Sequence, residues 1–280
     1  MNILNLQDIE QEAALRLDSN ALEYYRGGAA DELTLRRNRS DFDDIVLYPR
    51  VLRDVSHRSL RCTLLGQTFD MPIGIAPTAM QCLAHHEGER ATAHAAVAMN
   101  VPMILSTTST IAVEDVAQVE GVQLWFQVYV YKDRATTQEI VQRAVHAGCT
   151  ALVLTVDAPY LGKREREARI GFHLPEHLCL PHYTRLQAAH VPAHQGESGL
   201  VRHFAQNIDP ALTWNDILWL EKISGVPVIV KGIMRADDAI QAAAYGARGI
   251  IVSNHGGRQL DTVQSSIRAL PAVADAVGHC

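Results

Sequence analysis

The chain has 280 residues, a formal net charge of −6 and an apolar fraction of 48%, as is ordinary for a globular protein. No block of Lys or Arg stands out, which argues against a nucleic-acid partner, because phosphate binding needs a basic face. No apolar run reaches the roughly 20 residues that cross a bilayer. The acidic N-terminus also lacks the features of a signal peptide. We therefore expect a cytoplasmic protein without a membrane segment, forming a single domain over residues 1–280.

The N-terminal part, residues 1–48, is predicted to be helical. Apolar residues fall on one stripe between residues 6 and 25, Asn5 is a suitable N-cap, and Gly27 lies where the helix should end. A short hairpin is expected around residues 60–69.

From residue 73 onwards, short apolar runs alternate with helical segments. The runs cover residues 73–76, 102–105, 123–130, 151–156, 226–230 and 249–252, and the main helices 87–99, 113–119, 134–147, 235–245 and 265–277. Continuous apolar runs between helices are typical of parallel strands buried on both faces. The pattern predicts an α/β fold with about six βα units over residues 73–280. The pattern alone fits either an open doubly wound sheet or an incomplete TIM (β/α)8-type barrel, and the residues at the strand ends, given below, favour the incomplete barrel.

One connection is unusually long. Residues 158–212 are rich in Pro, His and Gln, and a loop of this length is usually functional or disordered. We interpret it as a mobile lid or insertion at the C-terminal face of the strands.

Cysteines and histidines give no metal motif. The five cysteines are dispersed without a C-x-x-C pair, which is typical of free thiols. Histidines stand at 85 and 86 and, in the long connection, at 173, 177, 182, 190 and 194. They lack a helical H-x-x-x-H pair or a carboxylate at ligand spacing, so we expect solvated loop residues and no metal site.

Polar residues follow almost every apolar run. They are Pro77, Thr78, Ala79, Ser106, Gln127, Tyr129, Thr155, Asp157, Lys231, Ser253, His255 and Arg258. In a β/α-barrel these positions converge on the C-terminal mouth, where such folds place their active sites. Taken singly, each is also explained as a strand-end or turn residue.

The strongest local signal is the segment SNHGGRQLD at residues 253–261. His255 precedes two glycines, whose backbone can bend sharply and approach a ligand, and Arg258 carries a planar fork suited to a carboxylate. Taken alone, the segment is explained equally well as a Gly-rich turn with a solvated His and Arg.

This segment resembles the active-site signature of the FMN-dependent 2-hydroxy-acid dehydrogenases and oxidases, in particular the glycolate oxidase and L-lactate oxidase type. The resemblance extends along nearly the whole chain in the family's order. It includes YYxGGA from residue 24, RxN from 36, IAPTAMQ from 75, EGE from 87, FQVYVYKDR from 126, LTVDAP from 154 and VKG from 230.

The resemblance implies roles in substrate handling. His255 would be the catalytic base, with Asp157 beside it favouring the imidazolium and raising its pKa. Arg258 and Arg164 would hold the substrate carboxylate, assisted by the Tyr24 hydroxyl. Tyr129 would contact the substrate hydroxyl.

The resemblance also implies FMN as the cofactor. Lys231 would lie near the flavin N1–O2 edge and stabilise the reduced ring. Further flavin contacts would come from Pro77, Thr78, Ala79, Ser106, Gln127, Tyr129, Thr155 and Ser253. The implied reaction is oxidation of a small L-2-hydroxy acid to the 2-oxo acid. The run from Pro77 to Met80 resembles the oxidase branch and favours oxygen as the electron acceptor, with hydrogen peroxide as product.

Two departures from the family pattern bear on this expectation. Position 108 is Thr where plant glycolate oxidases carry Trp, so the pocket is expected to admit a bulkier side chain than that of glycolate. The family's seventh and eighth strands, whose loops bind the flavin phosphate, have no counterpart before Cys280. The alternative is therefore a truncated, non-catalytic fragment that does not retain flavin. The resemblance leaves a homo-oligomer open, and no C-terminal peroxisomal tripeptide is present.

Overall fold

The computed structural model describes residues 2–186, 190–191 and 198–278. Its centre is a parallel sheet in the order β3-β4-β5-β6-β7. The strands are β3 (Met103–Ser106), β4 (Leu124–Val128), β5 (Leu152–Thr155), β6 (Val228–Ile233) and β7 (Gly249–Val252). The first three are buried at every residue, which explains their continuous apolar sequences. The predicted parallel α/β fold is confirmed.

The first of the six predicted strands is reduced to one bridge. Ile75 pairs in parallel with Met103, and no strand is assigned around it. Pro72 and Pro77 flank this segment and have no N–H to donate, which limits the length of a ladder. Within the described residues, the fold is an incomplete TIM-type barrel of five strands and one bridged segment.

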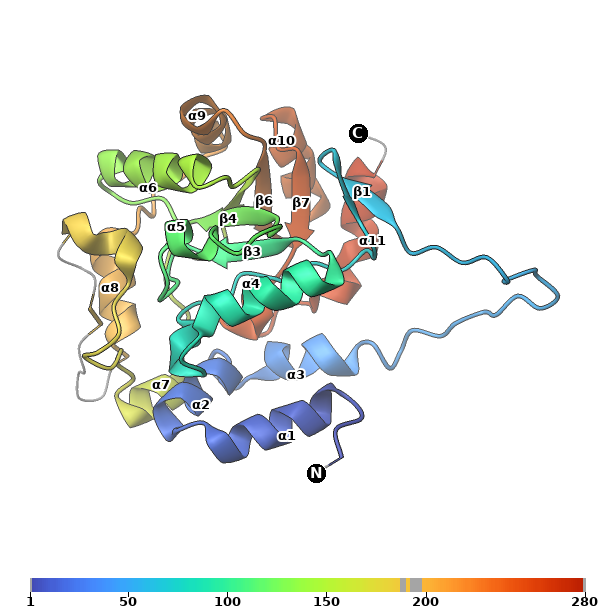
Figure 1. Cartoon of the computed structure of the whole chain (residues 1–280), viewed down its shortest axis with the longest axis horizontal. Coiled ribbons are helices and arrows are strands. Elements are labelled where there is room, and N and C mark those ends of the chain that lie inside the picture. Colours follow the sequence, from blue (N-terminus) through green and yellow to red (C-terminus); the bar gives the residue numbers. More distant parts are fainter. Residues whose placement is uncertain (1, 187–189, 192–197, 279–280) are drawn as a thin grey trace.

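The predicted helices cover the outside of the sheet (Figure 1). They are α4 (Gly88–Met99), α5 (Val113–Val116), α6 (Arg134–His146), α10 (Ala236–Ala244) and α11 (Ser266–Val277). At the far edge, β7 pairs only with β6 among the described strands, and its residues are half-buried.

The N-terminal segment contains three helices. The helix predicted over residues 6–25 is divided into α1 (Leu6–Arg16) and α2 (Ser19–Arg26), because Leu17 is extended and the Asp18 side chain caps α2. The third helix, α3 (Leu33–Ser40), falls within the segment 1–48 predicted to be helical, although no separate helix was predicted there. Its first N–H groups, at Leu33 and Thr34, donate to the Asp261 carboxylate, which fastens the segment to the 253–261 turn.

The long connection is more ordered than its sequence predicts. It contains α7 (Glu165–Ile170), the 3-10 helix η2 (Pro181–Leu186) and α8 (Gly199–Asn207), followed by α9 (Asn215–Ser224). The sequence analysis interpreted residues 158–212 as a mobile lid or insertion and did not predict the helices within it. Residues 187–189 and 192–197 lie outside the described residues.

Residues 45–61 form an extended segment that projects away from the sheet before the predicted hairpin, which is observed as β1 (Cys62–Leu64) and β2 (Gln67–Phe69) (Figure 1). Its apolar side chains are exposed, as at Leu47 (88%) and Leu52 (102%).

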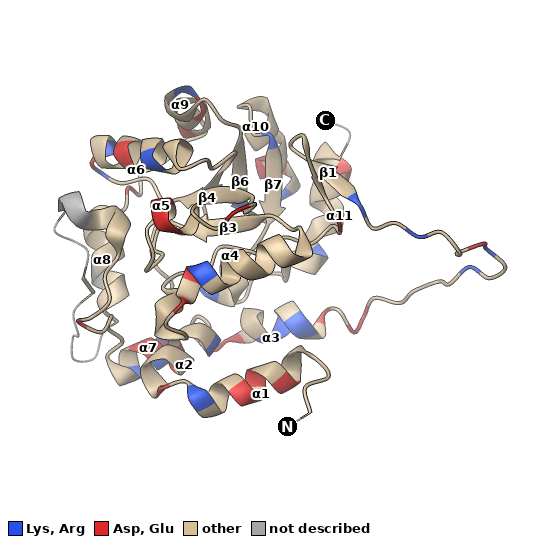
Figure 2. Ribbon diagram, viewed as in Figure 1, with Lys and Arg blue, Asp and Glu red and all other residues tan. Residues whose placement is uncertain are grey.

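The outer helices carry both signs of charge, as on α1, α6 and α9 (Figure 2). Among the described residues, no helix is long and apolar enough to span a bilayer. Four cysteines are free thiols, as predicted, and Cys280 lies outside the described residues.

Candidate active site

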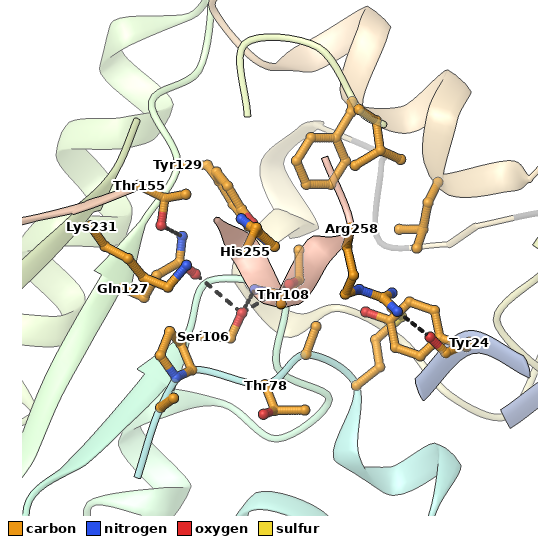
Figure 3. A pocket seen from close by; sticks show the side chains of 18 of the residues that line it. Tyr24, Thr78, Ser106, Thr108, Gln127, Tyr129, Thr155, Lys231, His255 and Arg258 are labelled. Carbon is orange, nitrogen blue, oxygen red and sulfur yellow. Dashed lines mark hydrogen bonds between the residues drawn. The ribbon is translucent and has the colours of Figure 1, made fainter. Parts of the chain in front are cut away.

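A cavity of about 330 Å³ opens at the C-terminal ends of the strands. The residues that line it are distant in the sequence and come from the ends of the five strands, the segment after the bridge at Ile75, α2, α8 and the connection that leads into α7 (Figure 3). They include Tyr24, Pro77, Thr78, Ala79, Ser106, Gln127, Tyr129, Thr155, Arg164, Lys231, Ser253, His255 and Arg258. Of the predicted site residues, only Asp157 does not line the cavity, and it lies behind His255. The predicted convergence is therefore observed.

A row of buried polar groups crosses three neighbouring strands. Gln127 accepts a hydrogen bond from Ser106 Oγ at 3.2 Å and donates to Thr155 Oγ1 at 3.0 Å. The strand register places Ser106 opposite Gln127 and Thr155 opposite Lys231, so the row continues to the Lys231 amine.

His255 is held by Asp157. Its Nδ1 lies 2.7 Å from Asp157 Oδ1. A carboxylate can only accept, so Nδ1 carries the proton and Nε2 keeps its lone pair. His255 adopts a left-handed backbone with φ of 59°, which is unusual for a residue with a side chain and is frequent at functional sites.

Asp157 raises the pKa of His255, as predicted, but the pKa as a whole is lowered. Burial lowers this pKa below 6.5 and outweighs the hydrogen bond that His255 donates to Asp157, which raises it, while the positive charge of Lys231 lowers it further. The imidazole is consequently neutral at neutral pH and can accept a proton.

The glycine at position 232 allows Asp157 to lie close to β6. Gly232 has φ of 114° and stands at an irregularity in the β6–β7 pairing. A Cβ on this residue would lie 2.7 Å from the Asp157 Cβ, so a larger residue would displace the carboxylate.

Arg258 lies on the other side of the cavity from Lys231 (Figure 3). Its Nη1 donates to the carbonyls of Tyr24 and Gly27, both at 2.6 Å, and its guanidinium stacks over the Tyr24 ring at 4.9 Å (Figure 3). Arg164 is buried, and its Nε donates to the Arg258 carbonyl at 3.3 Å. The two predicted carboxylate ligands are thus adjacent.

Both arginines donate to Glu167, which the sequence analysis did not identify. The available signal was the Arg164-x-x-Glu167 spacing, because residues three apart meet on a helix.

Two tyrosines complete the polar lining. Burial is the main cause that raises the pKa values of Tyr24 and Tyr129, so both phenols stay protonated and can donate hydrogen bonds.

The remaining wall of the cavity is largely apolar. Thr108 contributes a small side chain whose hydroxyl lies 2.9 Å from Ser106 Oγ. Leu161 lies in the cavity wall, and α8 adds Leu200 and Phe204. The ring of Phe204 packs edge-on against Tyr129 at 4.9 Å. The predicted lid therefore places one ordered helix against the site.

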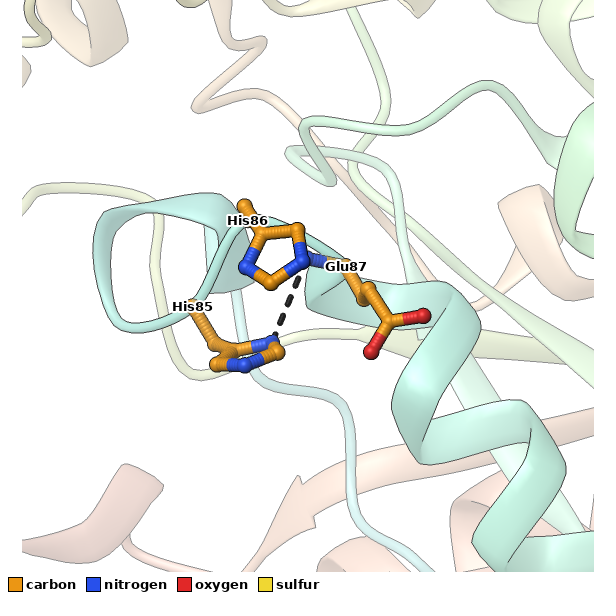
Figure 4. Close-up of side chains that lie close together, drawn as sticks. All are labelled: His85, His86 and Glu87. Atoms are coloured by element: carbon orange, nitrogen blue, oxygen red, sulfur yellow. Dashed lines mark hydrogen bonds between the residues drawn. The ribbon is translucent and has the colours of Figure 1, made fainter.

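The histidines outside the site differ from their prediction in two places. His182 is buried, not solvated: its Nε2 accepts from the Val113 N–H and its Nδ1 lies 2.9 Å from the Thr107 carbonyl. His85, His86 and Glu87 place one ligand atom each within 4.8 Å of one another, so a carboxylate does lie at ligand spacing (Figure 4). This cluster is exposed and does not line the cavity.

The cavity fits a flavin ring. The Ser106–Gln127–Thr155 row offers buried donors and acceptors to a polar ring edge. Lys231 is buried beside this row, and within the described part of the chain its ammonium has no hydrogen bond or ion pair. A parallel β/α fold with such a row, a neutral base and paired arginines defines an enzyme that binds a flavin and an anionic substrate.

Comparison with known proteins agrees with this class. The model of the family described as FMN-dependent dehydrogenase matches residues 13–280. The chain is 50% identical to an L-lactate oxidase of Nostoc sp., covering 98% of this chain and 76% of the relative. It is 43% identical to 2-hydroxyacid oxidase 1 of Mus musculus, covering 97% of this chain and 74% of the relative.

The solved structures give the same result. A mandelate oxidase crystallised with (S)-4-hydroxymandelic acid superposes with a TM-score of 0.94 at 37% identity, covering 99% of this chain and 77% of that one. The chain therefore belongs to the FMN-dependent dehydrogenase family, and it is an FMN-dependent enzyme that oxidises hydroxy acids. It spans about three quarters of the length of these relatives.

Proposed function

We propose that the protein oxidises a small L-2-hydroxy acid to the 2-oxo acid, with oxygen as the electron acceptor and hydrogen peroxide as the product. The observation that carries this proposal is the geometry of His255. Its Nδ1 is fixed by Asp157 at 2.7 Å, so its Nε2 is available as a base in a cavity that also contains Arg164 and Arg258. The similarity to an L-lactate oxidase supports oxygen as the acceptor.

The roles follow from the chemistry of each group. Arg258 and Arg164 bind the substrate carboxylate, and the Tyr24 hydroxyl donates to it. Tyr129 donates to the substrate hydroxyl, which directs the reacting carbon towards His255. His255 takes up a proton from the substrate, and the Asp157 carboxylate stabilises the imidazolium that results.

Bound FMN would supply the sink for the two electrons, and these electrons, with the two protons that the substrate loses, would convert oxygen into hydrogen peroxide. Ser106, Gln127, Thr155, Ser253 and the backbone from Pro77 to Ala79 would hold the flavin ring. Lys231 would balance negative charge on it.

The side-chain pocket admits groups larger than that of glycolate. Thr108 is small, and Leu161, Leu200 and Phe204 offer an apolar surface. We propose that L-lactate and L-2-hydroxy acids with longer apolar side chains are better substrates than glycolate.

The decisive experiment is an anaerobic titration of the purified chain, with FMN added, followed by absorption spectroscopy. L-Lactate should bleach the flavin band, and admission of oxygen should restore the band and release one hydrogen peroxide per substrate. A bleached band that oxygen does not restore would argue against oxygen as the acceptor. A flavin band that L-lactate does not bleach would contradict the proposed substrate class.

Replacing His255 by Ala tests the base. Turnover should fall by about 10²- to 10⁴-fold, the usual contribution of general-base catalysis, while flavin binding is kept. His85→Ala, an exposed histidine outside the cavity, is the matched control and should leave turnover unchanged. Equal turnover in the two variants would contradict the assignment.

A further inference from the structure

A fully buried carboxylate joins the two arginines of the proposed clamp. Glu167 Oε1 accepts from Arg164 Nη1 at 3.1 Å and from Arg258 Nη2 at 3.2 Å. Its other oxygen, Oε2, accepts from Ser198 Oγ at 2.8 Å. Glu167 has no exposed surface and does not line the cavity, so it acts on a ligand through the groups that it holds, which are the two arginines and Ser198.

Glu167 determines how much charge the clamp presents. Two guanidinium groups carry two positive charges, and the carboxylate cancels one of them, which leaves one for a ligand. Among the other side chains of the site, the formal charges of Lys231 and Asp157 sum to zero, although the two form no ion pair, and His255 is neutral. The site as a whole therefore carries one net positive charge, which matches one carboxylate on the ligand.

Glu167 also connects the clamp to α8. Ser198 is the residue directly before this helix, and Leu200 and Phe204 on the helix line the cavity. The same carboxylate thus fixes the arginines at one end of the cavity and the start of the helix that forms its apolar wall.

We propose that Glu167 is a positioning residue that limits the clamp to one net positive charge and so makes the site select monocarboxylates over dicarboxylates. This inference rests on the proposed function, because it takes Arg164 and Arg258 as the carboxylate ligands.

The test compares two ligands of nearly the same shape. Oxalate is a dianion and oxamate a monoanion at neutral pH. Their dissociation constants are measured by isothermal titration calorimetry on the 280-residue chain with FMN present. In Glu167→Gln the clamp gains one positive charge, so binding of oxalate should improve about tenfold relative to oxamate, as is reasonable for a unit charge near a partly desolvated site.

Three variants separate charge from structure. Glu167→Asp keeps the charge. It should keep the ratio of the oxalate and oxamate dissociation constants, even where both ligands bind more weakly. Ser198→Ala removes a hydrogen bond but no charge and should behave in the same way. Glu165→Gln removes a charge from the same helix, where Glu165 pairs with Lys163 and Arg169 outside the clamp, and should leave the ratio unchanged.

The outcomes are distinct. A selective gain for oxalate in Glu167→Gln, absent from the three other variants, supports the proposal. An equal loss of both ligands in Glu167→Gln would overturn it, because a merely structural residue gives that result. Wild-type protein that binds neither ligand would overturn the proposed function and this inference with it.

Discussion

At the scale of single residues, the titration of His255 is controlled by opposing influences. Burial lowers its pKa, and Asp157 raises it. Because the base must be neutral to accept a proton, kcat/KM should rise with pH through this pKa and reach its plateau at a lower pH than an ordinary histidine with a pKa of 6.5 would give.

Replacing Asp157 by Asn removes the influence that raises the pKa of His255. The acid limb of the kcat/KM profile should therefore move to still lower pH. The plateau should fall by about 10²- to 10⁴-fold, because the imidazolium formed in the reaction loses its stabilising carboxylate. Steady-state rates between pH 4.5 and 8 measure both effects. A shift of the limb to higher pH would contradict the geometry found at 2.7 Å.

Replacing Arg258 by Lys tests the clamp. The planar guanidinium of Arg258 donates to the Tyr24 and Gly27 carbonyls and can bind a substrate carboxylate at the same time. A lysine ammonium lacks this planar fork, so KM should rise about tenfold or more. Arg166→Lys is the control, because Arg166 pairs with Glu23 and Glu32 outside the cavity. An unchanged KM in Arg258→Lys would argue against its role.

The sequence predicted most residues of the site, because polar residues at the ends of parallel strands must meet at one face. It did not predict Glu167, whose importance depends on Arg258, 91 residues away. It predicted that Asp157 raises the pKa of His255, but not that burial outweighs this influence, because burial is a property of packing.

At the scale of elements, strands and amphipathic helices were predicted where the apolar periodicity is strong. The helices of residues 158–212 were missed because they are short, with nine residues at most. Their stability comes from tertiary contacts, such as the buried Glu167 in α7 and the buried Leu200 in α8. At Ile75, by contrast, a strand was predicted but only one bridge forms, because the flanking prolines shorten it.

His182 illustrates such a contact, because it fixes η2 to the start of α5. Burial lowers its pKa to about 4. Between pH 6.5 and 4 the unfolded chain therefore binds more protons than the folded one, and the free energy of unfolding falls as the pH is lowered through this window. His203, whose pKa is also lowered to about 4, contributes in the same direction.

In His182→Gln the amide can replace both hydrogen bonds but cannot titrate. Urea unfolding at several pH values measures how the free energy of unfolding changes with pH. Between pH 6.5 and 4 the slope of this change should be smaller than in the wild type by the equivalent of about one proton. His177→Gln, at an exposed position, should retain the wild-type dependence. The same reduction in both variants would contradict the role given to His182.

At the scale of the whole molecule, the segment of residues 45–61 is the most accessible part of the described chain. It carries Arg50, Arg53 and Arg58 on extended, exposed backbone. Limited trypsin treatment should cleave here first, and mass spectrometry of the products identifies the site. Cleavage that begins instead within α4 or α6 would contradict this prediction.

The site does not require an unbroken chain through residues 45–61. The helices before this segment supply Tyr24, whereas the base and the arginines come after it. Hydrogen bonds join the two parts. The first N–H groups of α3 donate to the Asp261 carboxylate, and the side-chain amides of Asn38 and Asn254 bond to each other. A chain cut in the segment should therefore remain one particle. Residues 1–48 and the remainder, produced as separate polypeptides, should then reassemble into a single site by complementation.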